Sequence, residues 1–472
     1  MNKKGGIDTE TLVKLILVML VVIAVVGFVL FQVSPTLKSR TETEIIGTLQ
    51  KFGFKPQVDL TNSRAVAIYR TGAPRNILAY AGFELSDWTE PGPFAFSGTS
   101  GIALATADSD DDGEQEIMAV YRTQNSGEKS QLAYNFWDGV WSDRISVEDG
   151  DPKTDFTDGI SLTAADTDGD GVKEFWLAYR RFNSIVTMDY ASGFTGEPWG
   201  KIQKQNIRVA NFAALPDNVN RKDIALVAAN VDGDPSDEIF LFYRIKPLLQ
   251  IQGEIYYTIY NGGKWSKPIL LDFTNFDESG LVAVSGNLTD PGQETVMVIY
   301  GKNDQMWYSV WDRAKAFTNV KRVKELDGPL EGLDSNLAAT AGDFGNDGLD
   351  EVFLIYKQDK FWSELADTTD GTCGNPLDRP NHVFRIYDNG TWGNKTVVTC
   401  ASAADVAVVA GQFDSDANDE ALVLTRKSFS ENDVRIYWRL YNNNTISNRT
   451  LLTKDALSGI ALTYIPVKEE AS

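Results

Sequence analysis

Two stretches of the chain carry aspartates at alternate positions, followed by a glycine and then a glutamate. In the first stretch these residues are Asp108, Asp110, Asp112, Gly113 and Glu116. Alternate side chains of a tight loop turn toward one point, so the spacing places oxygen ligands at positions 1, 3, 5 and 9 of a hard-cation loop. Three close carboxylates without a counter-charge would repel one another, and a bound cation relieves that repulsion. Ligand number and loop flexibility favour Ca²⁺ over Mg²⁺, whereas the alternative is an Asx-turn hairpin without metal.

The pattern recurs along the chain with partial losses, and we expect two to four structural calcium sites. The predicted metal ligands are Asp108, Asp110, Asp112 and Glu116; Asp166, Asp168, Asp170 and Glu174; Asn230, Asp232, Asp234 and Glu238; Asp343, Asp347 and Glu351; and Asp414, Asp416 and Glu420. A further copy keeps only Asp290 and Glu294, and we expect no metal there. Because the glutamate at position 9 stands in all six copies, we also expect it to accept hydrogen bonds from the loop backbone.

Each loop joins two apolar strands, and six such units repeat. They cover residues 102–122, 161–180, 225–244, 281–300, 337–357 and 406–426, and their second strands end 56 to 69 residues apart. A third strand rich in aromatic residues follows, then often a hairpin turn and a tryptophan such as Trp141 or Trp265. Units of this length with four short strands are typical of propeller blades. We expect these tryptophans to pack between blades.

The two ends of the repeat region complement each other. Residues 65–70 repeat the second strand without a first strand before them, and residues 458–463 match the first strand at residues 100–105. Pairing the C-terminal strand with the N-terminal blade would close a ring and leave no long exposed edge. The sequence therefore predicts an all-β fold over residues 51–472, a seven-bladed β-propeller closed by its N- and C-terminal strands.

The units resemble FG-GAP or VCBS repeats, as in the integrin α-subunit propeller and many microbial surface proteins, over roughly residues 52 to 466. The resemblance implies that the acidic loops bind calcium structurally and that partners dock on the opposite face. There, the ends of the second strands would form a ring. Its members, a possible site for an anionic glycan or a carboxylate-bearing partner, are Tyr69, Arg70, Tyr121, Arg122, Tyr179, Arg180, Tyr243, Arg244, Tyr356, Lys357 and Arg426. In the alternative interpretation, each basic residue pairs with an acidic residue of the next blade.

The N-terminal region predicts a single-pass membrane anchor. Residues 1–11 form a short inner segment, residues 12–33 are apolar enough for a transmembrane helix, and residues 34–50 form a stalk. The positive-inside bias places the N-terminus inside and the propeller outside, at an archaeal or bacterial cell surface. A cleaved secretory signal is the alternative. The residues from Lys3 to Glu10 also resemble a class III or type IV prepilin signal, which would be cut after Gly5.

Composition narrows the functional classes. The formal net charge of −22 argues against nucleic acid, because phosphate binding draws on clustered lysine and arginine. The only two cysteines, Cys373 and Cys400, are a possible disulfide, and five glycosylation sequons suit an exported chain. With the sole histidine at position 382, no catalytic histidine set exists. We therefore expect a non-enzymatic surface protein for adhesion or for recognition of a glycan or protein; the alternatives are a polysaccharide-active lyase or glycosidase and a pilin-like filament subunit.

Overall fold

The computed structural model describes residues between Leu60 and Pro466, with gaps, of which the longest cover residues 191–204, 208–223, 324–336 and 359–380. All described residues belong to one compact unit, Val58–Gly72 with Asn76–Ser472. The predicted leader, membrane helix and stalk at residues 1–50 lie outside the described residues, and so do Cys373 and the side chain of Cys400. Within the described part of the chain, no helix is long and apolar enough to cross a membrane.

The described residues form seven antiparallel sheets, here called blades and numbered from the first acidic loop. Blade 1 comprises β5 (Ile102–Ala107), β6 (Glu116–Thr123), β7 (Gln131–Asp138), β8 (Val140–Trp141) and β9 (Ile145–Ser146). Blade 2 comprises β10 (Ile160–Ala165), β11 (Glu174–Arg181), β12 (Ser184–Tyr190) and β13 (Gln205–Ile207). Blade 3 comprises β14 (Ile224–Ala229), β15 (Glu238–Ile245), β16 (Gln252–Asn261), β17 (Lys264–Trp265) and β18 (Ile269–Asn275).

The remaining blades repeat this order. Blade 4 comprises β19 (Leu281–Asp290), β20 (Gln293–Lys302), β21 (Gln305–Val310) and β22 (Lys321–Arg322). Blade 5 comprises β23 (Leu337–Gly342), β24 (Glu351–Gln358), β25 (Asn381–Asp388), β26 (Thr391–Trp392) and β27 (Thr396–Cys400). Blade 6 comprises β28 (Ala403–Gly411), β29 (Glu420–Ser430), β30 (Asp433–Asn442), β31 (Thr445–Ile446) and β32 (Thr450–Thr453). Blade 7 combines β33 (Ala456–Tyr464) with β1 (Ala65–Thr71), β2 (Ile77–Glu84), β3 (Asp87–Trp88) and β4 (Gly92–Phe96).

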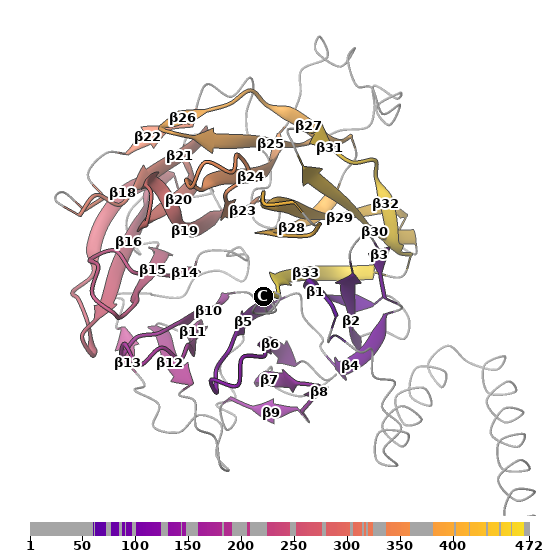
Figure 1. The fold of residues 1–472 in the computed structure, drawn as a ribbon, viewed down its shortest axis with the longest axis horizontal. Coiled ribbons are helices and arrows are strands. Elements are labelled where there is room, and N and C mark those ends of the chain that lie inside the picture. Colours follow the sequence, from indigo (N-terminus) through magenta and orange to yellow (C-terminus); the bar gives the residue numbers. More distant parts are fainter. Residues whose placement is uncertain are drawn as a thin grey trace, which may run out of the picture. The chain divides into compact units, whose positions relative to one another are not determined.

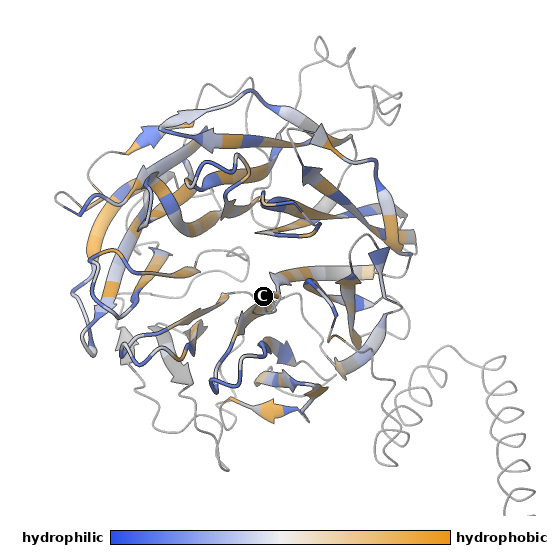
Figure 2. Ribbon diagram, viewed as in Figure 1, coloured by the Kyte–Doolittle hydropathy of each residue, from blue (hydrophilic) through white to orange (hydrophobic). Residues whose placement is uncertain are grey.

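The first strands of the blades line the centre of a ring (Figure 1). They contact one another in the order β5, β10, β14, β19, β23, β28 and β33, and β33 contacts β5 again. This closed circuit makes the fold a β-propeller, as the repeats predict. The second strands are buried on both faces, for example Ile239 to Tyr243 in β15, because each lies between the two neighbouring blades. Their near-continuous apolar sequences reflect this position (Figure 2).

The ring is closed by the antiparallel pair β1 and β33. Ala67 lies opposite Leu462, and Tyr69 lies opposite Ile460. A second contact reinforces the closure, because the guanidinium of Arg64 donates hydrogen bonds to the carbonyl oxygens of Gln412 (2.8 Å) and Asp414 (2.7 Å) in blade 6. The predicted pairing of the two chain ends is therefore confirmed.

Aromatic residues fill the spaces between blades. Trp141 of blade 1 meets Tyr80 of blade 7 edge-on at 5.5 Å, and Trp392 of blade 5 meets Tyr308 of blade 4 at 5.6 Å. Edge-to-face pairs at these distances are favourable beyond the area that they bury. The tryptophans that follow the hairpin turns thus pack between blades, as expected.

Carboxylates also link consecutive blades at the acidic loops. The Oδ2 atom of Asp237 accepts the backbone N–H of Asp166 in the preceding blade at 2.9 Å, and the N–H of Asp237 donates to the Asp166 carbonyl at 2.6 Å. Equivalent carboxylates bind the first loop residue of the preceding blade at three more junctions. These four inter-blade clasps are Asp237 on Asp166, Glu294 on Asn230, Asp350 on Asn287, and Asp419 on Asp343. Arg64 occupies the same place at the junction that closes the ring.

At Gly411 the inner strand β28 lies so close to β33 that a side chain should not fit. A Cβ atom on Gly411 would overlap the ring of Tyr464 in blade 7. We expect Gly411→Ala to lower the free energy of unfolding by about 1–3 kcal/mol, as overpacking does, measured by denaturant unfolding. Gly393→Ala is the control, because its Cβ would meet only the Ile386 carbonyl at 3.4 Å. Combining Gly411→Ala with Tyr464→Leu should recover part of the loss; equal stability of both glycine variants would contradict the packing.

Candidate metal loops

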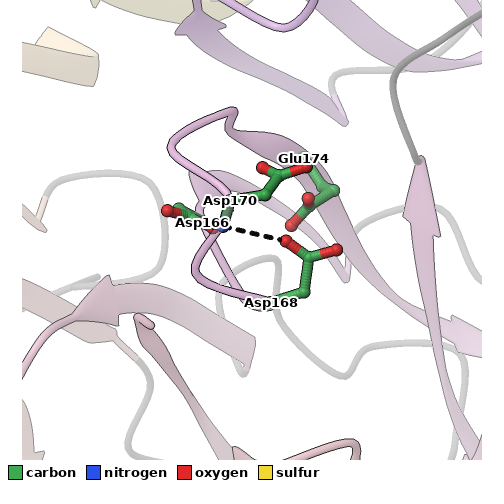
Figure 3. Close-up of side chains that lie close together, drawn as sticks. All are labelled: Asp166, Asp168, Asp170 and Glu174. Atoms are coloured by element: carbon green, nitrogen blue, oxygen red, sulfur yellow. Dashed lines mark hydrogen bonds between the residues drawn. The ribbon is translucent and has the colours of Figure 1, made fainter. Parts of the chain in front are cut away.

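Four of the acidic loops bring carboxylates together. One oxygen from each member lies within 4.8 Å of the others in the groups Asp166, Asp168, Asp170 and Glu174; Asp108, Asp110 and Glu116; Asp232, Asp234 and Glu238; and Asp414, Asp416 and Glu420. Figure 3 shows the first group gathered beside its loop. These clusters of oxygen donors could hold a metal ion, as the sequence predicts for the same residues.

Where position 1 is an aspartate, as in blades 1, 2 and 5, it organises the loop backbone. Asp166 Oδ2 accepts the N–H of Gly171 at 2.8 Å, while its Oδ1 accepts the N–H groups of Gly169 (2.7 Å) and Asp170 (3.1 Å). Both glycines have φ values of +77° and +91°, a region open to glycine because it lacks a Cβ. In Figure 3 the backbone of Asp170 also approaches Asp168 Oδ1, with a hydrogen bond of 3.3 Å. The loop shape therefore follows from Asx-type bonds that need no metal.

The glutamate at position 9 holds the loop by accepting hydrogen bonds from its backbone. Glu116 Oε2 accepts the backbone N–H of Ser109 at 2.6 Å and the Ser109 hydroxyl at 2.7 Å. Glu174 does the same with Thr167, at 3.0 and 2.9 Å. Glu238, Glu351 and Glu420 each accept the backbone N–H of the residue seven positions before them. The expected bonds to the loop backbone are thus present in five copies.

Burial disfavours the charged form of these glutamates. It raises the pKa of Glu116, Glu174, Glu238, Glu351 and Glu420 from 4.5 to about 7, and nearby aspartates add to the effect in each loop. A bound divalent cation would reverse this, since it stabilises the carboxylate. At the four clusters, protons and a bound cation would therefore compete near neutral pH for Glu116, Glu174, Glu238 and Glu420.

Glu420 supplies an independent indication of a ligand. Its side chain is fully buried, one oxygen accepts the N–H of Phe413 at 2.7 Å, and the other, Oε1, has no hydrogen-bond partner among the described residues. An unpaired buried carboxylate oxygen costs free energy. Because Glu420 lies in one of the four clusters, a cation at that cluster would satisfy it.

Two predicted ligand sets are smaller than the sequence suggests. Asp112 does not belong to the cluster of its loop. In blade 5 the described residues Asp343, Asp347 and Glu351 do not converge; Asp343 instead accepts the N–H groups of Asp347 (3.0 Å) and Gly348 (2.9 Å). Gly345 stands at position 3, so the loop lacks a carboxylate in the middle of the set.

In the third loop, Asn230 caps the turn by accepting the N–H of Gly233 at 2.8 Å.

The expectation of a position-9 glutamate in all six copies is wrong for blade 4. In blade 3, Glu238 pairs with Ala229 at the end of the inner strand, whereas in blade 4 the residue paired with the equivalent Gly286 is Thr295. Glu294 therefore stands one position earlier, where Asp237 stands in blade 3. It acts as a clasp and accepts the N–H of Asn230 at 2.8 Å.

The ring of tyrosines and basic residues at the other ends of the second strands is largely buried. Tyr69, Tyr121, Tyr179, Tyr243 and Tyr356 are each at most 2% exposed, so the expectation that they present a ligand surface is wrong for the tyrosines. They lie between two blades, where the second strand packs on both faces.

The basic members of the ring make structural contacts. Arg122 is buried, and Arg426 forms a 2.6 Å ion pair with buried Asp405. Arg244 is partly exposed and lies near the carbonyls of Gly280 and Gly301, at 3.5 and 3.4 Å. Arg70 and Lys357 are partly exposed, and the side chain of Arg180 lies outside the described residues. These contacts differ from the expected pairing with an acidic residue of the next blade, since Arg426 pairs within its own blade and Arg244 lies near backbone carbonyls of blade 4.

The clasps are structural contacts that the sequence motifs do not reveal. A signal for three of them is present in the sequence, because Asp237, Asp350 and Asp419 each stand directly before the position-9 glutamate as an Asp-Glu pair. The spacing alone does not reveal that the aspartate belongs to the neighbouring blade's loop, since that contact joins residues about 70 positions apart.

The chain is similar in fold to several solved structures, but no protein family is identified for it. No protein-family model matches the chain, and no curated protein sequence matches it. The similar solved structures include AofleA from Arthrobotrys oligospora, with 10% identity, a TM-score of 0.44 and coverage of 77% of this chain and 89% of that one. A lectin from Aleuria aurantia has 12% identity, a TM-score of 0.43 and coverage of 80% and 100%. The α-L-arabinofuranosidase arb93a from Fusarium graminearum has 12% identity, a TM-score of 0.43 and coverage of 70% and 88%.

These findings correct one expectation and leave another as a hypothesis. A sialidase and a polysaccharide lyase also stand among the similar structures, beside the arabinofuranosidase. The expectation that the chain is not an enzyme, which followed from the lack of a catalytic histidine set, is therefore corrected, because glycan-active enzymes stand among the similar structures. The resemblance to FG-GAP and VCBS repeats has no matching family model behind it and stays a resemblance.

Proposed function

We propose that this chain is a calcium-binding propeller that recognises or processes glycans outside the cell. The observation that carries the glycan-directed part is a pocket of about 530 Å³ between blades 4 and 5, lined by carboxylates, hydroxyls, an amide and aromatic rings. Its volume lies in the range of small-molecule sites. Carboxylates and amides bind sugar hydroxyls, and aromatic rings offer the apolar surface that sugar rings also need.

Calcium binding is supported by the residues of the four clusters. They provide oxygen donors only, three or four carboxylates each, and one of them contains the unpaired Oε1 of Glu420. Calcium takes six to eight oxygen ligands with flexible geometry, so backbone carbonyls and water would complete each site. The ion would supply the positive charge that the clustered carboxylates lack and would stabilise the folded propeller.

Processing of a glycan is the second candidate, and a specific observation favours it. Three carboxylates outside the metal clusters, Asp290, Glu294 and Asp312, line the same pocket. Hydrolysis of a glycosidic bond commonly needs two carboxyl groups, one as general acid and one as base or nucleophile. Catalysis without histidine is thus within the chemistry of this pocket.

The location of the propeller is part of the proposal. The apolar residues 12–33 would anchor it in the membrane with the blades outside. The prepilin-like run offers a filament subunit as the alternative. Mass spectrometry of the chain isolated from membranes tests this: we expect residues 12–33 to be retained and the N-terminus to precede Gly5. A mature chain starting at Gly6 would indicate prepilin-type processing, and one lacking the apolar stretch a cleaved signal.

Calcium should stabilise the protein. We expect the calorimetric unfolding temperature to rise when calcium replaces chelator, because an ion bound only by the folded state adds its binding free energy to stability. At a free calcium concentration 100 times the Kd, one site contributes about 2.7 kcal/mol. Asp168→Asn should reduce this gain, whereas the control Glu114→Gln, an exposed carboxylate outside the clusters, should keep it. An unfolding temperature indifferent to chelator would leave the loops as metal-free turns.

Glycan recognition and glycan processing give different results with the same reagents. We expect the calcium-loaded protein to bind a subset of immobilised oligosaccharides. Incubation with the bound oligosaccharides, followed by mass spectrometry, separates the two candidates, because a lectin leaves them intact and a hydrolase or lyase releases shorter products. Absence of both binding and products across a broad panel would refute the glycan-directed proposal, whatever the calcium result.

A further inference from the structure

Blade 4 differs from the other blades at the loop between its first two strands. In blade 3 the residues between Ala229 and Glu238 fold into the compact acidic loop, whereas in blade 4 the two strands continue as a hairpin in which Asp290 pairs with Gln293. Pro291 and Gly292 form its turn, and Gly292 has a φ of +77°. Proline followed by glycine suits a type II turn, which requires positive φ at its third residue. Blade 4 has therefore exchanged a folded metal loop for an extended hairpin.

The extended hairpin forms one side of the pocket between blades 4 and 5. Thr289, Asp290 and Gln293 contribute from the hairpin, and Trp311 and Asp312 contribute from the segment after β21. Tyr387 and the β25–β26 turn of blade 5 complete the lining. The pocket thus exists where one repeat departs from the pattern that the others share.

The lining offers hydrogen-bonding groups above an aromatic base. Asp290 and Gln293 are exposed, so their carboxylate and amide are free to bind hydroxyl groups as acceptor and donor. Tyr308 and Tyr387 are almost fully buried and meet edge-on at 5.6 Å, which makes the base of the pocket rigid. A ligand with many hydroxyl groups and one apolar face fits this combination better than a purely apolar molecule does.

The walls of the pocket are held in place by contacts with blade 3. Glu294, beside Gln293, accepts the N–H of Asn230 at 2.8 Å. The ring of Trp311 packs edge-on against Phe240 of blade 3 at 5.2 Å and against Phe317 of its own blade at 5.1 Å. These contacts order the hairpin and the segment after β21 before any ligand arrives, which lowers the entropic cost of binding.

We infer that this pocket is the glycan-binding site and that it takes a neutral sugar unit, an inference that rests on the proposed glycan-directed function. Three carboxylates and two exposed cations, Arg313 and Lys321, line the pocket, so its formal charge is negative. The chain as a whole carries −22. The excess of carboxylates in the lining disfavours uronate, sialylated or sulfated glycans. Asp290 and Gln293 bind the sugar hydroxyls, and the tyrosine base supports the sugar ring.

The experiment is a glycan array on the calcium-loaded full chain, followed by calorimetric titration with the neutral oligosaccharide that binds best. Asp290→Ala and Gln293→Ala are the test variants, and both positions are exposed, so the fold should be retained. Asp87→Ala is the matched control, an exposed aspartate in the hairpin of blade 7. We expect each test variant to weaken binding about tenfold, the scale of one lost hydrogen bond to a charged or polar group, and the control to bind like the unchanged chain.

The possible outcomes distinguish an error in the pocket assignment from an error in the proposed function. An unchanged chain that binds no glycan and releases no product refutes the proposed function. A chain that binds a neutral glycan, with full affinity in both test variants, overturns the pocket assignment and leaves the function standing. Preference for acidic glycans on the array overturns the neutral-sugar assignment. Thermal unfolding of each variant confirms that any lost affinity does not come from lost folding.

Discussion

The pairing of β1 with β33 is the constraint on which the rest of the propeller depends. Six blades take their inner strand from the residues just before their second strand, but blade 7 has none to use until the chain returns at its C-terminal end. Without that strand, β1 would expose a row of unpaired backbone groups, and the circuit of inner strands would break between β28 and β5.

The acidic loops combine two tasks in one short sequence. The aspartate at position 1 and the glutamate at position 9 accept backbone N–H groups, so hydrogen bonds within the protein fix the shape of the loop. The clasps then join three of these loops and the blade 4 hairpin to the next blade, so a carboxylate such as Asp237 contributes to ring assembly. Both tasks increase the density of negative charge at one end of the blades, and clustered carboxylates are what a calcium ion requires.

Blade 4 is informative because it departs from a pattern that the other blades repeat. Blade 4 keeps the clasp residue Glu294 but has, in place of the acidic loop, a hairpin with a Pro291-Gly292 turn. The ring is preserved because the clasp and the aromatic packing remain, while the residues released from the metal loop are free to line a pocket. A propeller can therefore specialise one junction without losing closure, because each blade contacts mainly its two neighbours.

Local periodicity was sufficient to predict the strands, the acidic loops and the closing pair, because these depend on residue spacing within one unit and on the match between residues 458–463 and 100–105. Local periodicity did not predict the contacts between blades. The repeated Tyr-Arg pairs predicted an exposed ring, but their tyrosines are buried. Their burial depends on the neighbouring sheet, which the pattern within one unit does not show. Likewise, spacing placed Glu294 at position 9 of its loop, and only the strand register moved it by one position. Side chains that act across blade junctions are set by packing between residues far apart in the chain, which no local pattern encodes.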